Sequence, residues 1–128
     1  MKIDHIAFWV NDLERIKNFY MQYFNMYCGE KYENKGKAFS SYFLSFGSGA
    51  RIEIMHRPDI SDQIGGKGIT NGLTHFAISV GSKKKVEELT ELIRSDGFEI
   101  VGEPRITGDG FYESIISDPE GNHIEITE

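Results

Sequence analysis

The 128-residue sequence contains one cysteine, three prolines and no long hydrophobic run. Because Cys28 has no second thiol in the chain, an intramolecular disulfide is excluded, and a reducing compartment is expected. No apolar stretch approaches the roughly 18 residues of a membrane-spanning helix. The first residues also lack the pattern of a signal peptide. These features predict a cytoplasmic protein that has no membrane partner.

Basic residues are also scarce. There are 14 Lys and Arg side chains against 20 Asp and Glu, which gives a net charge of −6, and the basic residues form no block. This balance disfavours nucleic acids and anionic membranes, because both attract basic surfaces. In contrast, 39% of the residues are hydrophobic, 12% are aromatic and 14 are glycines. Such a composition is typical of a folded globule with many turns.

The chain contains an internal repeat. Residues 3–10 align with residues 73–80 without a gap, at an offset of 70. Residues 45–55 align with residues 117–127 at an offset of 72. Two blocks at nearly equal offsets indicate that the chain consists of two homologous halves.

The halves cover about 1–56 and 73–128, joined by a linker over 57–72, and both predict the same order of elements. In the first, the pattern predicts a strand over 3–10, a helix that begins after Asp12, and strands over 27–33, 38–46 and 50–55. In the second, it predicts a strand over 73–80, a helix between Ser82 and Gly97 whose apolar stripe includes Leu92, and strands over 98–106, 111–118 and 122–127. We therefore predict an α+β fold in which two tandem βαβββ modules form one domain over 1–128. The modules are expected to build a curved mixed sheet around a cleft.

Four polar side chains occupy equivalent strand positions in the two halves. Side chains alternate between the faces of a strand, and one face of each of these strands is uniformly apolar. The opposite face carries His5, Glu53, His75 and Glu125. Two imidazoles and two carboxylates suit a divalent ion such as Ni²⁺, Co²⁺ or Zn²⁺, with Mn²⁺ and Fe²⁺ as alternatives. A buried salt-bridge cluster is the competing interpretation, but without a cation its two carboxylates would repel each other.

Four segments carry a family resemblance. They are HIAFWVNDLE at 5–14, ARIEI at 50–54, THFAISV at 74–80 and DPEGNHIE at 118–125. Together they resemble the vicinal-oxygen-chelate superfamily, the group of glyoxalases, bleomycin-resistance proteins and extradiol dioxygenases. The resemblance implies paired βαβββ modules around a metal ion that leaves two positions open for adjacent oxygens of a small-molecule substrate. It also implies a homodimer, in which paired modules come from one chain or from two exchanged chains.

Within this group the His-Glu-His-Glu set resembles glyoxalase I, particularly its compact nickel- or cobalt-dependent class. Dioxygenases and fosfomycin-resistance transferases typically lack a carboxylate at the position of Glu53, and methylmalonyl-CoA epimerases usually have Gln there. The resemblance implies a lyase or isomerase in which Glu125 or Glu53 moves a proton between two carbons of a hemithioacetal. The alternatives are a non-catalytic small-molecule or antibiotic-resistance protein of the same fold, and an epimerase or thiol transferase.

Five further residues are expected to contact the substrate. Trp9 stands where glyoxalase I usually has an Arg that holds a glutathione carboxylate, and Arg57 stands where it usually has an Asn. Arg51, Met55 and His123 share the strand faces of the proposed ligands. Core packing of Trp9 and solvent exposure of the charged residues are the competing interpretations. The two departures leave the identity of the thiol open.

Overall fold

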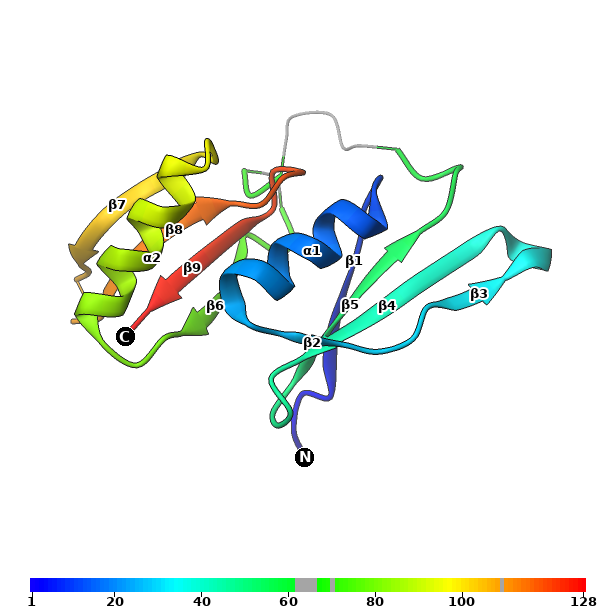
Figure 1. The fold of residues 1–128 in the computed structure, drawn as a ribbon, viewed down its shortest axis with the longest axis horizontal. Helices are drawn as coiled ribbons and strands as arrows, with labels where there is room; N and C mark the ends of the chain where they lie inside the picture. The colour runs from blue at the N-terminus through cyan, green and yellow to red at the C-terminus, as the bar shows by residue number, and fades with distance from the viewer. Residues whose placement is uncertain (62–66, 70, 109) are drawn as a thin grey trace. The chain divides into compact units, whose positions relative to one another are not determined.

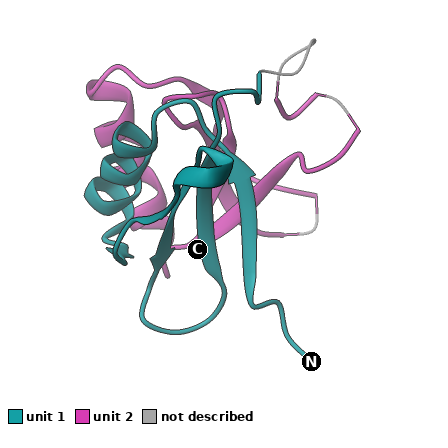
Figure 2. Ribbon diagram, turned by 90° about the vertical axis from the view of Figure 1, so that its right-hand side faces the viewer, with its two compact units in different colours: residues 1–62 teal, residues 63–128 magenta. Residues whose placement is uncertain are grey.

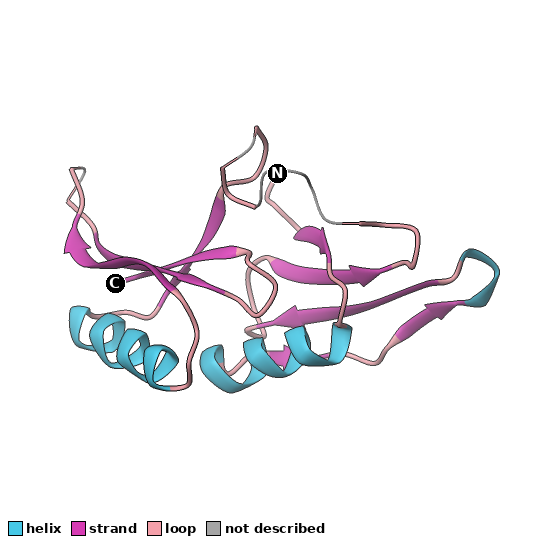
Figure 3. Ribbon diagram, turned by 90° about the horizontal axis from the view of Figure 1, so that it is seen from above, coloured by secondary structure: helices cyan, strands magenta, loops and turns pink. Residues whose placement is uncertain are grey.

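The computed structural model describes residues 1–61, 67–69, 71–108 and 110–128 (Figure 1). The chain forms two compact units, Met1–Asp62 and Gln63–Glu128 (Figure 2). In each unit one helix lies against one face of a mixed sheet (Figure 3). The predicted α+β class is confirmed. Residues 62–66 and 70 of the predicted linker lie outside the described residues, and the domain and linker bounds stay a prediction.

The first unit contains the strand–helix–strand order that its sequence pattern predicts. Its elements are β1 (His5–Trp9), α1 (Leu13–Phe24), β2 (Tyr27–Cys28), β3 (Tyr32–Asn34), a short 3-10 helix (Lys35–Lys37), β4 (Phe39–Ser45) and β5 (Arg51–His56). The sheet order is β1-β5-β4-β2, with β3 also on β4, and β1 runs parallel to β5.

The strand predicted over 27–33 is divided into β2 and β3. Cys28 pairs with Leu44, but Tyr32 pairs with Ser41, so the first strand contains one residue more than its partner between these pairs. An extra residue cannot join the ladder and bends the strand. This irregularity separates two short strands that pair with the same neighbour.

The second unit repeats the arrangement. Its elements are β6 (His75–Ser79), α2 (Lys83–Ser95), β7 (Ile100–Ile106), β8 (Tyr112–Ser117) and β9 (His123–Thr127), in the sheet order β6-β9-β8-β7. Here β6 runs parallel to β9, as β1 does to β5. The described strands thus form two hydrogen-bonded mixed sheets, one in each unit, as expected for two tandem βαβββ modules.

Both helices begin at the predicted caps. The Asp12 carboxylate accepts a hydrogen bond from the backbone N–H of Arg15 at 3.0 Å, and the Ser82 hydroxyl accepts one from Lys85 at 3.3 Å. These bonds satisfy amide groups that have no partner within the helix. Among the described residues, neither helix is long and apolar enough to cross a membrane.

The buried stripe of α2 differs from the prediction at one position. Leu92 is 50% exposed, whereas Thr90 is fully buried. The Thr90 hydroxyl donates to the Val86 carbonyl at 2.6 Å and also lies 2.7 Å from the Ser114 hydroxyl on β8. Because both of its hydrogen-bonding functions are satisfied there, a threonine can occupy this core position. The prediction that Leu92 faces the sheet was wrong.

The strand faces agree with the predicted alternation. The apolar face of each C-terminal strand is buried at Ile52, Ile54, Ile124 and Ile126. The intervening Glu53 and Glu125 are only partly exposed and point to the opposite face. The backbone therefore orients both glutamates away from the helix side of their sheets.

Candidate functional site

The first candidate ligand pair lies on β1 and β5. These strands are parallel, with His5 opposite Arg51 and Ala7 opposite Glu53. His5 Nε2 lies 3.8 Å from Glu53 Oε2, although the two residues are separated by almost the whole unit in sequence. The His5 side chain is 39% exposed and that of Glu53 is 16% exposed. The pair thus stands on the sheet face with its histidine open to ligands.

The second pair repeats this geometry on β6 and β9. His75 lies opposite His123, and Ala77 lies opposite Glu125. His75 Nε2 is 3.2 Å from Glu125 Oε2, with side-chain exposures of 38% and 16%. The near-identical exposures and register indicate that the duplication preserved the pair as a unit.

Both pairs suit a divalent ion. Two ligand atoms bound to one ion at about 2.0–2.2 Å stand about 3.0–3.5 Å apart. The 3.2 Å separation in the second unit lies within that range, and the 3.8 Å separation in the first is slightly longer. In the described part of the chain, no three His, Cys, Asp or Glu side chains gather to hold an ion. Each unit therefore offers two of the four predicted ligands.

His5 is surrounded by a small set of contacts that the sequence did not predict. Its Nδ1 lies 2.9 Å from Asp4 Oδ2, and Arg51 Nη2 lies 2.6 Å from the same oxygen. The Arg51 guanidinium also lies 4.4 Å from the centroid of the Phe43 ring. Hydrogen bonding to His5, together with Arg51, lowers the pKa of Asp4 to about 2. Arg51, predicted as a substrate contact, is thus engaged with Asp4 and Phe43.

Three predicted substrate residues gather at the end of β1 and β5. Trp9 and Met55 are opposite each other in the parallel ladder. The Arg57 guanidinium lies 5.5 Å from the centroid of the Trp9 indole, and Arg57 Nε is 2.5 Å from Asp59 Oδ1. The indole is partly exposed and packs edge-on against Phe39 at 6.0 Å. Trp9 therefore packs against another partly exposed ring and has a guanidinium beside its indole.

The fifth predicted substrate residue, His123, lies against Gly68, a residue of the predicted linker. Gly68 has a φ of +78°, and a Cβ at this residue would lie 2.4 Å from His123 Nδ1. Only glycine allows so close an approach in this backbone conformation. From the sequence, this glycine is only a residue of the predicted linker over 57–72, and its contact could not be recognised because the partner is distant in sequence.

Besides the pair of His75 with Glu125, the same sheet face carries an ion pair that was not predicted from the sequence. Glu113 is buried on β8, and its Oε1 lies 3.3 Å from Arg105 Nη2. On the neighbouring strand, Thr127 is opposite Glu113, and its buried hydroxyl has no hydrogen-bond partner among the described residues. Alternation along β8 could have placed Glu113 on this face, because Ile115 is opposite Glu125.

The turn before β9 is held by Asp118. Its Oδ1 accepts hydrogen bonds from the backbone N–H groups of Glu120 and Asn122, both at 2.9 Å, and its Oδ2 accepts one from the Asn122 side chain at 2.7 Å. Burial raises the pKa of Asp118, although these hydrogen bonds oppose the shift. The turn determines where β9 begins and thereby positions His123 and Glu125.

The fold and its side chains define a class of protein: two βαβββ modules, each with one histidine–glutamate pair on the sheet face opposite its helix. Residues 2–126 match the family model of the Glyoxalase/Bleomycin resistance protein/Dioxygenase superfamily. The chain belongs to this superfamily, and the resemblance inferred from the sequence is confirmed.

Individual relatives support this assignment. The chain is 30% identical over 126 residues to a lactoylglutathione lyase of Arabidopsis thaliana, a match that covers 95% of this chain and 42% of the relative. The chain thus spans less than half the length of this curated relative. The crystal structure of glyoxalase I from Zea mays matches with a TM-score of 0.80 and 26% identity, over 98% of this chain and 44% of that one. A glyoxalase family protein from Enterococcus faecalis shares the fold, with a TM-score of 0.80 at 22% identity over 99% of this chain and 97% of that one.

Proposed function

We propose that this chain is a metal-dependent, glyoxalase I-like lyase or isomerase that moves a proton next to a carbonyl group. Its substrate is a hemithioacetal or a similar small molecule with adjacent oxygens. The observation that carries the proposal is the repeated pair of a histidine nitrogen and a glutamate oxygen, 3.8 Å apart in one unit and 3.2 Å apart in the other. Similarity to a lactoylglutathione lyase supports the same reaction class. A homodimer and a cytoplasmic location stay predictions.

We propose that both pairs bind one divalent ion through His5, Glu53, His75 and Glu125. The mixed nitrogen and oxygen ligands suit Ni²⁺, Co²⁺ or Zn²⁺, with Mn²⁺ or Fe²⁺ as alternatives. When bound, such an ion supplies Lewis-acid chemistry that polarises a carbonyl oxygen and offsets the negative charge developing there.

The proton is moved by a glutamate in this proposal. Glu53 and Glu125 occupy equivalent strand positions, and each side chain is 16% exposed. A carboxylate that is shielded from water but still reachable can take a proton from one carbon and return it to its neighbour. We assign this role to Glu125 or to its counterpart Glu53.

We propose that the substrate contacts lie on the sheet faces that carry the four proposed metal ligands. Trp9 and Met55 offer an apolar wall, and the Arg57 guanidinium beside the indole offers donors for an anionic group. Arg51 and His123 are proposed to contact the substrate at the rim. Because Arg51 is already paired with Asp4, its contribution to substrate binding is expected to be smaller than that of Arg57.

The test combines metal analysis with an activity assay. The purified protein is titrated with Ni²⁺, Co²⁺ and Zn²⁺ by calorimetry and then assayed with hemithioacetals formed from methylglyoxal and several thiols. We expect one ion per proposed four-ligand site. Glu125→Gln and Glu53→Gln are both assayed, and the variant that removes the proton-moving group is expected to lose about 100-fold or more in turnover.

A matched control is Glu88→Gln, which makes the same chemical change on the exposed face of α2, where Glu88 pairs with Lys84. This variant is expected to keep full activity. A protein that binds no divalent ion would contradict the metal site. Metal binding without turnover of any hemithioacetal would contradict the lyase and favour a binding protein of the same fold.

A further inference from the structure

Asp4 makes two contacts through one carboxylate oxygen. Its Oδ2 lies 2.9 Å from His5 Nδ1 and 2.6 Å from Arg51 Nη2. The backbone carbonyl of Asp4 also accepts a hydrogen bond from the Arg51 N–H at 2.9 Å. The side chain is exposed to solvent, yet three contacts determine where its carboxylate lies.

The partners of Asp4 are themselves held in place. Arg51 is opposite His5 in the parallel ladder, and its guanidinium lies 4.4 Å from the centroid of the Phe43 ring. The Phe43 ring meets the His5 ring edge-on, with centroids 5.4 Å apart. These contacts connect four neighbouring side chains, those of Asp4, His5, Arg51 and Phe43. Each of them therefore limits the conformations that its neighbours can adopt.

These contacts have a consequence for the two nitrogens of His5. A neutral imidazole carries one hydrogen, and an anionic acceptor beside Nδ1 favours that hydrogen on Nδ1. Nε2 then has a free lone pair and faces the Glu53 carboxylate, which also has only lone pairs to offer. Two acceptors cannot hydrogen-bond to each other, and their separation of 3.8 Å agrees with that. Two such lone-pair donors are suited to share a cation.

We propose that Asp4 is a positioning residue that fixes the Nδ1–H tautomer and the ring orientation of His5, so that Nε2 is preset as a metal ligand. Arg51 supports this role by holding the Asp4 carboxylate. The inference rests on the proposed metal site, but its first consequence is a property of the metal-free protein.

The second unit provides an internal comparison. Thr74 precedes His75 at the position equivalent to Asp4, and His123 is opposite His75 where Arg51 is opposite His5. At 3.2 Å from Glu125 Oε2, His75 Nε2 is close enough to donate a hydrogen. We therefore expect His5 in the Nδ1–H form and His75 with a substantial Nε2–H population in the metal-free protein.

Long-range ¹H–¹⁵N NMR of the metal-free protein at about pH 8, where imidazoles are mostly neutral, distinguishes the two tautomers. We expect Nδ1–H for His5 in the unmodified chain and a shift toward Nε2–H in Asp4→Ala. Asp4→Asn keeps an acceptor but loses its charge, so an intermediate population is expected. Asp59→Ala is the matched control, because it removes another exposed carboxylate from an arginine pair and should leave His5 unchanged.

Calorimetry with Zn²⁺ and Ni²⁺ supplies the second readout. Asp4→Ala is expected to weaken binding by about 10- to 100-fold, as observed when partners of metal ligands are removed, while Asp59→Ala binds normally. An unchanged His5 tautomer or an unchanged affinity in Asp4→Ala would overturn the inference and leave the proposed function standing. An unmodified chain that binds neither ion would overturn the metal site itself, and with it this role for Asp4.

Discussion

The two units present the same candidate ligands in different surroundings. In the first, His5 contacts Asp4, which is paired with Arg51. In the second, Thr74 precedes the histidine, and His123 takes the ladder position of Arg51. The repeat has kept the side chains suited to an ion and changed the residues that hold them. Equivalent ligands in a duplicated protein therefore need not be equally preorganised.

The two units also differ in the residues that form their cores. Helix α1 buries an aromatic cluster in which Phe19 lies 5.5 Å from Tyr20 and 4.9 Å from Tyr23 between ring centroids. Helix α2 buries no aromatic residue and instead uses aliphatic side chains and the hydrogen-bonded Thr90. One helix is thus held mainly by ring packing, and the other partly by a directional polar contact.

The largest effect is expected from breaking the aromatic core. Phe19→Ala should lower the free energy of unfolding by about 3–5 kcal/mol, and Ile93→Ala in the second unit by about 2–5 kcal/mol. Phe19→Leu, which preserves much of the volume, should lose less. Urea unfolding followed by circular dichroism measures the loss, and the fluorescence of the single Trp9 reports on the first unit. A cost below about 1 kcal/mol for Phe19→Ala would contradict the importance of the ring cluster.

The polar contact in the second core is expected to have a smaller effect. Thr90→Val leaves the buried Ser114 hydroxyl without its partner, which should cost about 1–3 kcal/mol. Ser114→Ala should cost a similar amount, and the double variant less than the sum of the two. Chemical denaturation of all four proteins gives the coupling energy. Additive costs would show that the two hydroxyls do not depend on each other.

Much of the fold could be predicted because it depends on local pattern. Strand alternation identified the buried faces at Ile52 and Ile124, and the caps Asp12 and Ser82 were recognised by residue type and spacing. The burial of Thr90 could not be predicted, because its partner lies 24 residues away and propensity favours a leucine in the core. Long-range hydrogen bonds of this kind leave no periodic signal.

The candidate site shows the same limit. His5 lies near Glu53 and His75 near Glu125, because the parallel pairing of β1 with β5 and of β6 with β9 places each pair on one sheet face. The convergence of all four side chains stays a prediction. The contact of Asp4 with His5 was missed, since neighbours along a strand point to opposite faces. Asp4 precedes β1, so its side chain is free of that alternation and can turn back to the histidine.

The contact of Gly68 with His123, both in the second unit, can be tested with two matched glycines. Gly68 and Gly81 have similar φ values of +78° and +84°, but only Gly68 would place a Cβ against a side chain, that of His123. Both Ala variants should lose about 1–2 kcal/mol from the left-handed backbone. Only Gly68→Ala should move the His123 imidazole resonances in NMR spectra. Equal shifts in both variants would contradict the contact.

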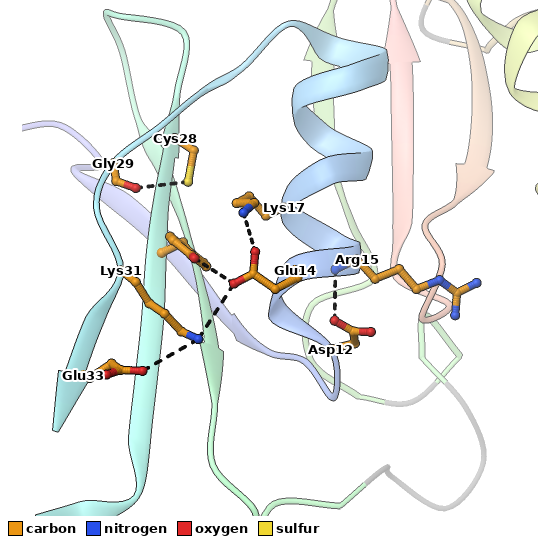
Figure 4. A network of polar contacts seen from close by, with 9 residues as sticks. Asp12, Glu14, Arg15, Lys17, Cys28, Gly29, Lys31 and Glu33 are labelled. Carbon is orange, nitrogen blue, oxygen red and sulfur yellow. Dashed lines mark hydrogen bonds and ion pairs between the residues drawn. The ribbon is translucent and has the colours of Figure 1, made fainter. Parts of the chain in front are cut away.

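The smallest expected effect is a difference in pH dependence between two carboxyl groups, one in each unit. A hydrogen bond from Lys17, supported by one from Tyr42, lowers the pKa of Glu14 (Figure 4). Burial instead raises the pKa of Asp118. A lowered pKa means that Glu14 stabilises the fold above its ordinary pKa and loses this contribution as the pH falls. A raised pKa means that the contribution of Asp118 is greatest in acid and declines as the pH rises through its folded-state pKa.

Carbon-detected NMR titration of the side-chain carboxyls measures both values directly. Glu14 is exposed and its ion pairs are screened by water, so its contribution to stability is small, and Lys17→Met should return its pKa toward the ordinary value. Asp118 should keep its raised pKa in the same variant, because its shift comes from burial and not from a basic neighbour in the first unit. If Lys17→Met shifted both groups equally, or if Asp118 titrated below its ordinary pKa, the contrast between a surface ion pair and a buried turn would be wrong.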